Sequence, residues 1–436
     1  MHLPNLLNYP AWFFDEGAYL TFSAQWQQTG LLSYYGHPFG ALAILAVLFA
    51  IVNPGSYLFP RILMVALSAV DGVLLYKVTD KMYKRSGGFA LVTSMLYVST
   101  PLSARYLRLV VVDNFMAFFL LASLLVLVSV KRKESYIVSS LLFGAAIVSK
   151  QTALFFIPAL LVLFKREKKT LPRSILWLLT AAVIPMLWAL YGVSQLGLSA
   201  FLGSQFALTG LGGDRAVNAI TLILQRITTR DPFIFVGLAG ALWAFYKRDI
   251  IVAFPLTYLV SFVALFLKIS TVYLIPVIPF FSLLATVLLF DIFDLTPRLR
   301  SLVKIRSYLL TILILVLIVS SLLLVTFQNP ATPQQQALNY VVDHHPQGVI
   351  MSYTYLWLFR QNHPEITVYD RYSVPWNQLQ NQTVYLIVDY PGDLTTINNI
   401  PQYHALYSAN ATQQSKMTFT DPASGYAVQV LQGTVA

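Results

Sequence analysis

Residues 308–327 read YLLTILILVLIVSSLLLVTF, and Gln328, Asn329 and Pro330 follow them directly. The apolar run has about the length of helix that crosses the hydrocarbon core of a bilayer, roughly 20 residues. Backbone N–H and C=O groups find no water at that depth, so a helix is the structure that satisfies them within the segment. The polar residues after it predict the end of a membrane domain.

The composition of the whole chain agrees with a lipid environment. Of its 436 residues, 57% are hydrophobic and only 11% are charged, whereas soluble globular proteins carry about 25% charged residues. A second apolar run, Leu109–Val130, is also long enough to span. We therefore expect an all-α polytopic membrane domain over residues 1–329, of which residues 1–60 form a first outer loop.

Residues 330–436 are rich in Gln, Asn, Asp and Tyr. A helical pattern near Gln334–His344 and short β-rich runs indicate a small extracytoplasmic α/β domain, of roughly the usual domain size. The expected strands are Val349–Tyr353, Thr367–Tyr369, Val384–Val388 and Ala427–Leu431.

The formal charge of +11 comes from basic residues that lie in short clusters between apolar runs. This arrangement fits the positive-inside rule better than a nucleic-acid partner. Cysteine is absent, which excludes disulfides and thiolate sites. We place these clusters in the cytoplasm: Lys77 to Arg85, Lys131 to Lys133, Lys165 to Arg173, Lys247-Arg248, and Arg298 to Arg306.

The clusters fix an alternating set of spans, which are Arg61–Tyr76, Gly88–Ser103, Leu109–Val130, Tyr136–Ser149, Thr152–Phe164, Ile175–Gln195, Pro232–Tyr246, Ile250–Leu267, Val272–Phe290 and Tyr308–Phe327. Two further segments precede them. Phe39–Val52 is too short to span and is expected to lie along the membrane or to re-enter. Ala18–Leu32 has the pattern of an interfacial amphipathic helix.

Ionisable residues gather on the predicted outer side, at or near membrane depth. An ionisable group inside the membrane costs at least about 2.5–3.5 kcal/mol, so it usually faces a cavity or a partner. Cations could hold a lipid phosphate, and a carboxylate could take the proton of an incoming hydroxyl. The residues are Asp15, Glu16, Arg61, Arg105, Arg108, Asp113 and Lys150.

The order of these residues resembles a known family. The motifs are Asp15-Glu16, Gly36-His37-Pro38-Phe39-Gly40, Pro60-Arg61, Arg108-Leu109-Val110-Val111-Val112-Asp113 and Ser149-Lys150-Gln151. They resemble the GT-C fold glycosyltransferases, in particular the dolichyl-phosphate-mannose protein mannosyltransferase family with its bacterial and archaeal relatives, including the aminoarabinose transferases. The resemblance covers roughly residues 12–165.

The resemblance implies a multi-pass enzyme of the cell membrane that moves a sugar from a polyprenyl-phosphate donor to a hydroxyl of a protein, glycan or lipid at the outer face, with inversion. It implies Asp15 as general base, with Glu16 as a second active-site acid. Asp113 would orient an arginine or the sugar, and His37 would line the pocket. Arg61, Arg108 and Lys150 would be donor-phosphate ligands, with Arg105 as a further candidate. A divalent cation is left open, and nothing in the sequence requires one.

The sequence departs from the family pattern in two places. Only 14 residues precede Asp15, where the family has a membrane helix, so that helix is either upstream of Met1 or missing. The motif His37-Pro38-Phe39-Gly40 replaces the family's His-Pro-Pro-Leu, so the local turn is expected to differ.

Plainer interpretations remain for these residues. Asp15 and Glu16 could simply favour a helix start; Asp113 could pair with Arg108 or Arg105; and the arginines could reach lipid headgroups. Lys150 and His37 could be ordinary loop residues. In the soluble domain, Asp343-His344-His345 is a weak metal candidate, and Asn381-Gln382-Thr383 and Asn410-Ala411-Thr412 match a short glycosylation sequon.

Two other functions also fit the composition. A transporter or flippase of an anionic lipid or lipid-linked sugar would explain intramembrane charges, but it predicts mid-membrane charges and inverted repeats. A non-catalytic assembly subunit would depend on residues 330–436 and tolerate replacement of Asp15.

Overall fold

The structure is a computed structural model of the whole chain. It describes residues 2–52, 55–85, 87–129, 133–166, 171–206, 231, 233–265, 271–295, 303–344, 346, 348–371, 373–379, 382–390 and 416–434. Three residues named above lie outside these ranges: the asparagines of the two predicted sequons, Asn381 and Asn410, and the metal candidate His345.

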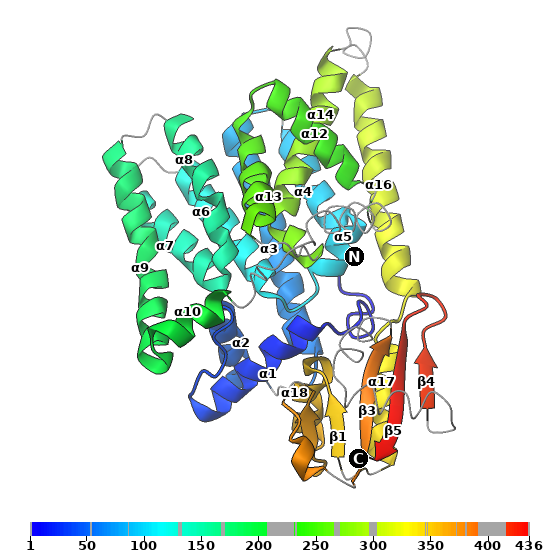
Figure 1. Cartoon of the computed structure of the whole chain (residues 1–436). Coiled ribbons are helices and arrows are strands. Elements are labelled where there is room, and N and C mark those ends of the chain that lie inside the picture. Colours follow the sequence, from blue (N-terminus) through cyan, green and yellow to red (C-terminus); the bar gives the residue numbers. More distant parts are fainter. Residues whose placement is uncertain are drawn as a thin grey trace.

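A bundle of roughly parallel helices forms the larger part of the molecule (Figure 1). Its helices are α3 (Leu58–Tyr83), α4 (Gly87–Ser99), α5 (Pro101–Tyr106), α6 (Val112–Ser129), α7 (Lys133–Ser149), η1 (Gln151–Phe156), α8 (Ile157–Arg166), α9 (Leu171–Leu196), α10 (Leu198–Phe206), α12 (Ile234–Tyr246), η3 (Ile250–Val252), α13 (Ala253–Leu265), η4 (Thr271–Val277), α14 (Ile278–Leu295) and α16 (Val303–Phe327). Each predicted span overlaps one of them. Among the described residues, five helices are long and apolar enough to cross a membrane.

The position of each helix in the bundle follows its apolar pattern. α6 and α14 are largely buried, whereas α9 and α16 lie on opposite sides of the bundle and expose rows of Leu, Ile and Val (Figure 1). Exposed apolar faces of this kind suit lipid tails rather than water. The chain is therefore a multi-pass membrane protein.

The predicted span Gly88–Ser103 is broken in the structure. α4 ends at Ser99, and α5 begins at Pro101, because proline suits the first position of a helix and cannot continue the preceding one. The Thr100 side chain accepts a hydrogen bond from the Ser103 N–H and caps this short helix.

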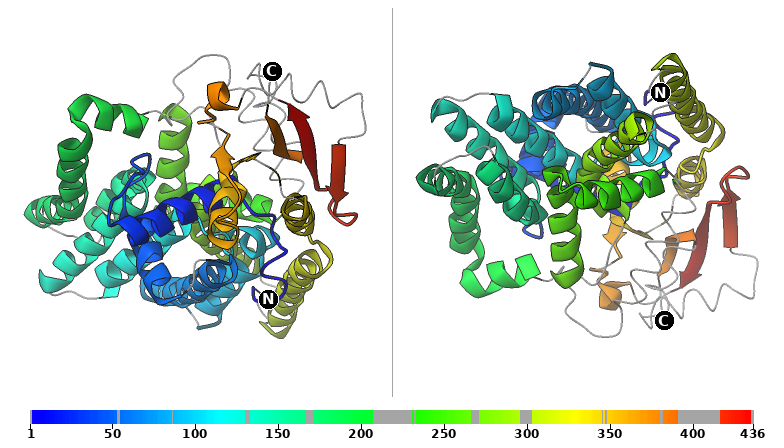
Figure 2. Two further views of the ribbon diagram at one scale, coloured as in Figure 1. Left: turned by 90° about the horizontal axis from the view of Figure 1, so that it is seen from below. Right: turned by 90° about the horizontal axis from the view of Figure 1, so that it is seen from above.

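The segment before α3 contains α1 (Phe14–Thr29) and α2 (Gly40–Ile51). α1 lies between α2 and α18 (Tyr353–Asn362), a helix of the C-terminal domain, as the view from below in Figure 2 shows. The helix predicted over Ala18–Leu32 is present as α1, but it is not amphipathic: most of its first half is buried, and its exposed side chains lie in its second half. The sequence could not show that the C-terminal domain would cover the second face.

The described residues of the C-terminal domain form a mixed five-stranded sheet with the helices α17 and α18, which confirms the predicted fold class. The strands are β1 (Gly348–Met351), β2 (Val368–Asp370), β3 (Thr383–Tyr390), β4 (Lys416–Thr420) and β5 (Ala427–Thr434), in the order β2-β1-β3-β5-β4. β1 pairs in parallel with β2 and β3, and β5 pairs antiparallel with β3 and β4. α17 (Thr332–Asp343) packs on β4 and β5. The strand β4 and the helix α18 were not predicted from the sequence.

The two parts of the chain are joined through the segment before α1. The Trp12 N–H donates to Gln334 Oε1 at 2.7 Å, and Gln334 Nε2 donates back to the Trp12 carbonyl at 3.1 Å. The Tyr57 hydroxyl donates to the Thr354 carbonyl at 2.7 Å. The start of α1 is thus held by both parts of the molecule.

Candidate functional site

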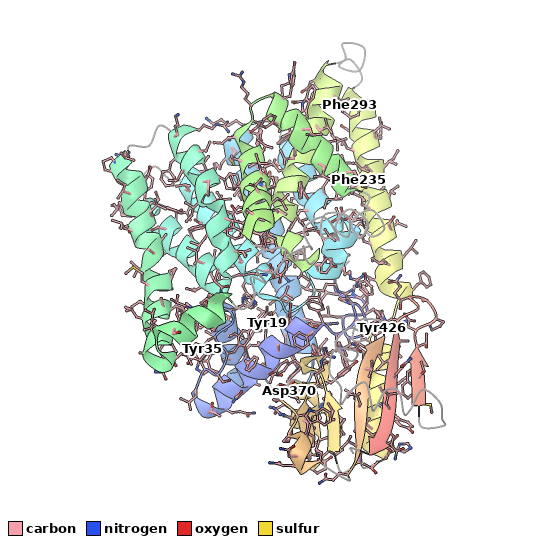
Figure 3. The ribbon with its side chains drawn as sticks, viewed as in Figure 1. Tyr19, Tyr35, Phe235, Phe293, Asp370 and Tyr426 are labelled. Carbon is pink, nitrogen blue, oxygen red and sulfur yellow. The ribbon has the colours of Figure 1, made fainter. Side chains whose placement is uncertain are left out.

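Asp15 and Glu16 lie in the first turn of α1, where the helix dipole favours negative charge. They meet different environments. The Glu16 side chain is fully buried, whereas Asp15 is partly exposed. Tyr19, one turn further along α1, lies on the side facing the membrane domain (Figure 3). The pair that the sequence presents as one motif is therefore two separate sites.

Glu16 forms a buried ion pair with Arg61. Arg61 Nε donates to Glu16 Oε1 at 2.9 Å, and Arg61 Nη2 donates to Glu16 Oε2 at 2.7 Å. Arg61 Nη1 donates to the carbonyls of Leu6 and Pro10, and the Val110 N–H donates to Glu16 Oε1. The pair thus connects the N-terminal segment, α1, α3 and the start of α6.

Lys150 and Asp113 form a second buried pair. Lys150 Nζ lies 2.7 Å from each carboxylate oxygen of Asp113, and both residues are 2% exposed. Lys150 is in an extended conformation between α7 and η1, where the helix is interrupted. Its Nζ also lies 4.1 Å from the centroid of the Tyr273 ring, a favourable cation–π geometry.

Asp15 lies within the field of this second pair. Burial raises the pKa of Asp15 to about 6; Lys150 acts to lower it, and Asp113 acts to raise it further. Because Asp15 keeps partial contact with solvent, its carboxylate can meet a substrate from outside. Asp15, Asp113 and Lys150, to which sequence reasoning gave different motifs, therefore form one charged cluster, which we call the Asp15 cluster.

His37 lies beside the Asp15 cluster. Its Nδ1 is 3.2 Å from Gln151 Oε1, and Gln151 Nε2 donates to the Gly36 carbonyl at 3.1 Å. Burial, followed by the nearby Lys150 charge, lowers the pKa of His37 to about 3. The imidazole is therefore neutral at physiological pH and acts as a hydrogen-bonding wall residue.

Aromatic side chains surround the same cluster. The Tyr19 ring lies 5.8 Å from His37, and the Tyr34 ring lies 6.0 Å from His37 and 4.6 Å from Phe22. Phe22 in turn lies 5.5 Å from Tyr353 of α18. Sequence reasoning missed Tyr19, Tyr34 and Tyr273 because scattered tyrosines in an aromatic-rich chain carry no spacing signal.

The remaining arginines lie apart from Lys150. Arg108 is fully buried; it donates to the Pro4 carbonyl and lies against the Tyr9 ring at 5.7 Å. Burial and the neighbouring Arg61 lower its pKa to about 9. Arg105 is partly exposed and lies against the Tyr106 ring at 5.7 Å; it makes no hydrogen bond or ion pair within the described part of the chain.

No group of three or more His, Cys, Asp or Glu side chains suited to a metal occurs among the described residues. His344, one of the weak metal candidates, is already engaged: its Nδ1 lies 2.7 Å from the Tyr340 carbonyl, and its ring lies 4.0 Å from that of Tyr340.

Residues 36–191 match a family model described as dolichyl-phosphate-mannose-protein mannosyltransferase. No curated protein matches the sequence. The matched segment includes His37, Arg61, Arg105, Arg108, Asp113 and Lys150, but it begins after Asp15 and Glu16.

Solved structures share the fold over nearly the whole chain. ArnT from Cupriavidus metallidurans in the apo state is 14% identical, with a TM-score of 0.61 over 98% of this chain and 95% of ArnT. The same protein bound to undecaprenyl phosphate is 13% identical, with a TM-score of 0.60 and the same coverage. An Archaeoglobus fulgidus oligosaccharyltransferase tethered with an acceptor peptide is 11% identical, with a TM-score of 0.55 over 88% of this chain and 67% of that one.

The chain therefore shares its fold with ArnT over nearly its whole length, and the family model covers the segment that contains most of the candidate charged residues. Residues 36–191 are thus similar to the dolichyl-phosphate-mannose-protein mannosyltransferase family, and the chain as a whole has the fold of ArnT.

Proposed function

We propose that this chain transfers a sugar from a polyprenyl-phosphate donor to a hydroxyl acceptor at the outer membrane face, with inversion and with Asp15 as general base. The observation that carries the proposal is the Asp15 cluster: a partly exposed carboxylate beside a buried lysine–aspartate pair. The nearness of this carboxylate to the lysine supports a base and a cation for the leaving phosphate in one site.

The donor class is supported by the family description, which names a dolichyl-phosphate-linked sugar, and by the ArnT structure bound to undecaprenyl phosphate. In the proposed step the acceptor oxygen attacks the anomeric carbon as its proton passes to Asp15. The bond from that carbon to the phosphate oxygen breaks, and the polyprenyl phosphate leaves as an anion. Lys150 stabilises the charge that develops on this anion.

Among the predicted phosphate ligands, Lys150 and Arg105 suit the role best. Lys150 lies beside Asp15, and Arg105 has no ion-pair partner in the described part of the chain. Arg61 donates all its described hydrogen bonds to Glu16, Leu6 and Pro10, so we propose an anchoring role for Arg61 and Glu16.

The basic loops support an assignment of the two ends of the bundle to the two sides of the membrane. Residues 85, 165–166 and 247–248 lie together at the end of the bundle opposite the C-terminal domain. By the positive-inside rule this end faces the cytoplasm. We therefore propose that the Asp15 cluster and the C-terminal domain are extracytoplasmic.

The test is transfer of a labelled sugar from a polyprenyl-phosphate donor by the purified full-length protein in liposomes. General-base catalysis is worth about 10²–10⁴-fold, so Asp15→Asn should lower kcat by that factor while donor binding and the unfolding midpoint stay near wild type. Asp343→Asn is the matched control, because Asp343 is an exposed carboxylate of α17, and it should leave transfer unchanged.

Equal turnover by wild type and Asp15→Asn would support the enzyme activity but contradict the role of Asp15 as general base. Movement of intact donor across the liposome membrane, without transfer to any acceptor, would instead support the flippase alternative.

A further inference from the structure

A cavity of about 870 Å³ lies at the basic end of the bundle, away from the Asp15 cluster. It is formed by the ends of α3, α8, α12 and α14, which meet at the top of Figure 1. Five cations and three carboxylates line it, together with the apolar side chains of Val162, Ile250 and Val287. Its lining therefore combines charged and apolar side chains.

Two of the carboxylates already have partners. Asp291 Oδ1 lies 2.9 Å from Arg85 Nη2, and Asp291 Oδ2 accepts from Trp243 Nε1 at 2.9 Å. Asp249 Oδ2 accepts from the Tyr83 hydroxyl at 2.8 Å, and its Oδ1 accepts from the Ile251 N–H at 3.1 Å. These acids fix the ends of the helices and do not neutralise the other cations.

Four cations of the lining are left without a carboxylate. Lys165 and Arg166 end α8, and Lys247 and Arg248 follow α12; all are exposed and make no ion pair with any described residue. Lys247 Nζ lies 5.1 Å from the Trp243 ring centroid. The cavity therefore holds a local excess of positive charge that an anion from outside can reach.

Arg248 occupies a position that favours glycine. Its φ is +57°, and the N–H groups of Arg248 and Asp249 return to the carbonyls of Phe245 and Ala244, as in a left-handed helix end. A side chain strains the backbone at such a φ. The chain keeps an arginine at this strained turn, on the wall of the cavity.

We propose that this cavity binds the phosphate headgroup of an anionic phospholipid from the adjacent leaflet. Arginine and lysine bind phosphate oxygens through charge-assisted hydrogen bonds, and basic pockets between the ends of membrane helices suit anionic headgroups. A lipid is favoured over a free phosphate because apolar side chains also line the cavity and because the cavity lies where apolar helices end. The site is independent of the sugar-transfer reaction.

The experiment measures the thermal unfolding midpoint of the full-length protein in uncharged detergent, titrated with dioleoylphosphatidylglycerol. Dioleoylphosphatidylcholine and inorganic pyrophosphate at matched ionic strength are the parallel arms. We expect phosphatidylglycerol alone to raise the midpoint. Lys165→Gln/Lys247→Gln should shift the lipid concentration for half the effect upward by roughly 30-fold, since each basic residue near anionic lipid contributes about a fivefold gain in binding.

Two control variants distinguish lipid binding in this cavity from unspecific electrostatic attraction of lipid to the protein surface. Lys77→Gln/Lys81→Gln removes the same charge from α3 at the same end of the bundle, outside the cavity lining, and should leave the lipid response unchanged. Arg248→Gly keeps the turn and removes the cation, so it should preserve the lipid-free midpoint yet weaken the lipid response.

Loss of the response in the Lys165/Lys247 variant alone would support the proposal. An equal loss in the Lys77/Lys81 variant, or no loss in either, would overturn it in favour of unspecific surface attraction. Stabilisation by pyrophosphate equal to that by phosphatidylglycerol would overturn the lipid assignment and leave a site for a free anion.

Discussion

Asp15 and Glu16 are neighbours in the chain, yet their side chains lie in different environments. Glu16 is saturated by Arg61 and the Val110 N–H and has no contact with solvent. Asp15 is partly exposed beside Lys150 and Asp113. One carboxylate is thus available for chemistry, and the other holds the helix start in place.

The environment of Asp15 predicts how activity depends on pH. Burial disfavours the charged carboxylate and raises its pKa to about 6. Only the deprotonated form can accept a proton, so kcat/KM should be level above about pH 7 and fall about tenfold per pH unit well below pH 6. The measurement is a pH profile of sugar transfer at fixed ionic strength. A profile that stays level down to pH 4.5 would count against Asp15 as base.

Paired substitutions at Lys150 and Asp113 can distinguish their effect on sugar transfer from their effect on stability. Lys150→Met leaves the buried Asp113 charge alone, and breaking a buried pair costs about 3–5 kcal/mol. The double variant Lys150→Met/Asp113→Asn removes both charges and should recover much of that stability. Sugar transfer should stay low in both, because the cation for the leaving phosphate is missing. Recovery of transfer together with stability would show that the pair is only structural.

At the scale of elements, the Glu16–Arg61 pair joins α1 to α3. Glu16→Gln should lower the free energy of unfolding by about 3–5 kcal/mol, because Arg61 is left as an unpaired buried charge. Glu365→Gln, at an exposed carboxylate of the C-terminal domain, is the matched control and should change stability little. Thermal unfolding in detergent checks both variants. If Glu16→Gln unfolds at the wild-type temperature while losing activity, Glu16 belongs to the chemistry instead.

The helices of the bundle could be predicted because long apolar runs between basic clusters leave few alternatives. Interruptions were harder to predict. The break after α4 was not predicted, although Pro101 begins α5, whereas the break at Lys150 was expected between the spans Tyr136–Ser149 and Thr152–Phe164. The strands β1, β2, β3 and β5 followed from β-rich runs, but β4 (Lys416–Thr420) alternates too briefly to stand out.

At the scale of the whole molecule, the fold positions the Asp15 cluster through contacts between distant parts of the chain. Asp15 is brought to Lys150 because α1 is held by α2 on one side and by α18 on the other. The sequence motifs predicted which types of residue would form the candidate site, and the family resemblance supported this through the order of the motifs along the chain. The division into a Glu16–Arg61 anchor and an Asp15 cluster depends on side-chain directions, which spacing along the chain does not encode.

The contact between α1 and α18 can be tested at Gly17. A Cβ atom at this position would lie 2.0 Å from the Tyr353 carbonyl oxygen, so Gly17→Val should displace α18 and cost at least about 1–3 kcal/mol. Limited proteolysis between residues 328 and 352 should become faster, and sugar transfer should fall. Gly203→Val is the control, because nothing lies within 4 Å of a Cβ there. Unchanged proteolysis in Gly17→Val would mean that the two parts are not held by this contact.

The close approach of Gly17 to Tyr353 also has a genetic consequence. The direction of Asp15 is set partly by a helix encoded more than three hundred codons later. In a selection for loss of sugar transfer, alleles in the α18 coding region should therefore appear among those at the charged residues. Second-site suppressors of a Gly17 allele should fall at Tyr353 or Thr354. Such suppressors would show that the two segments interact genetically.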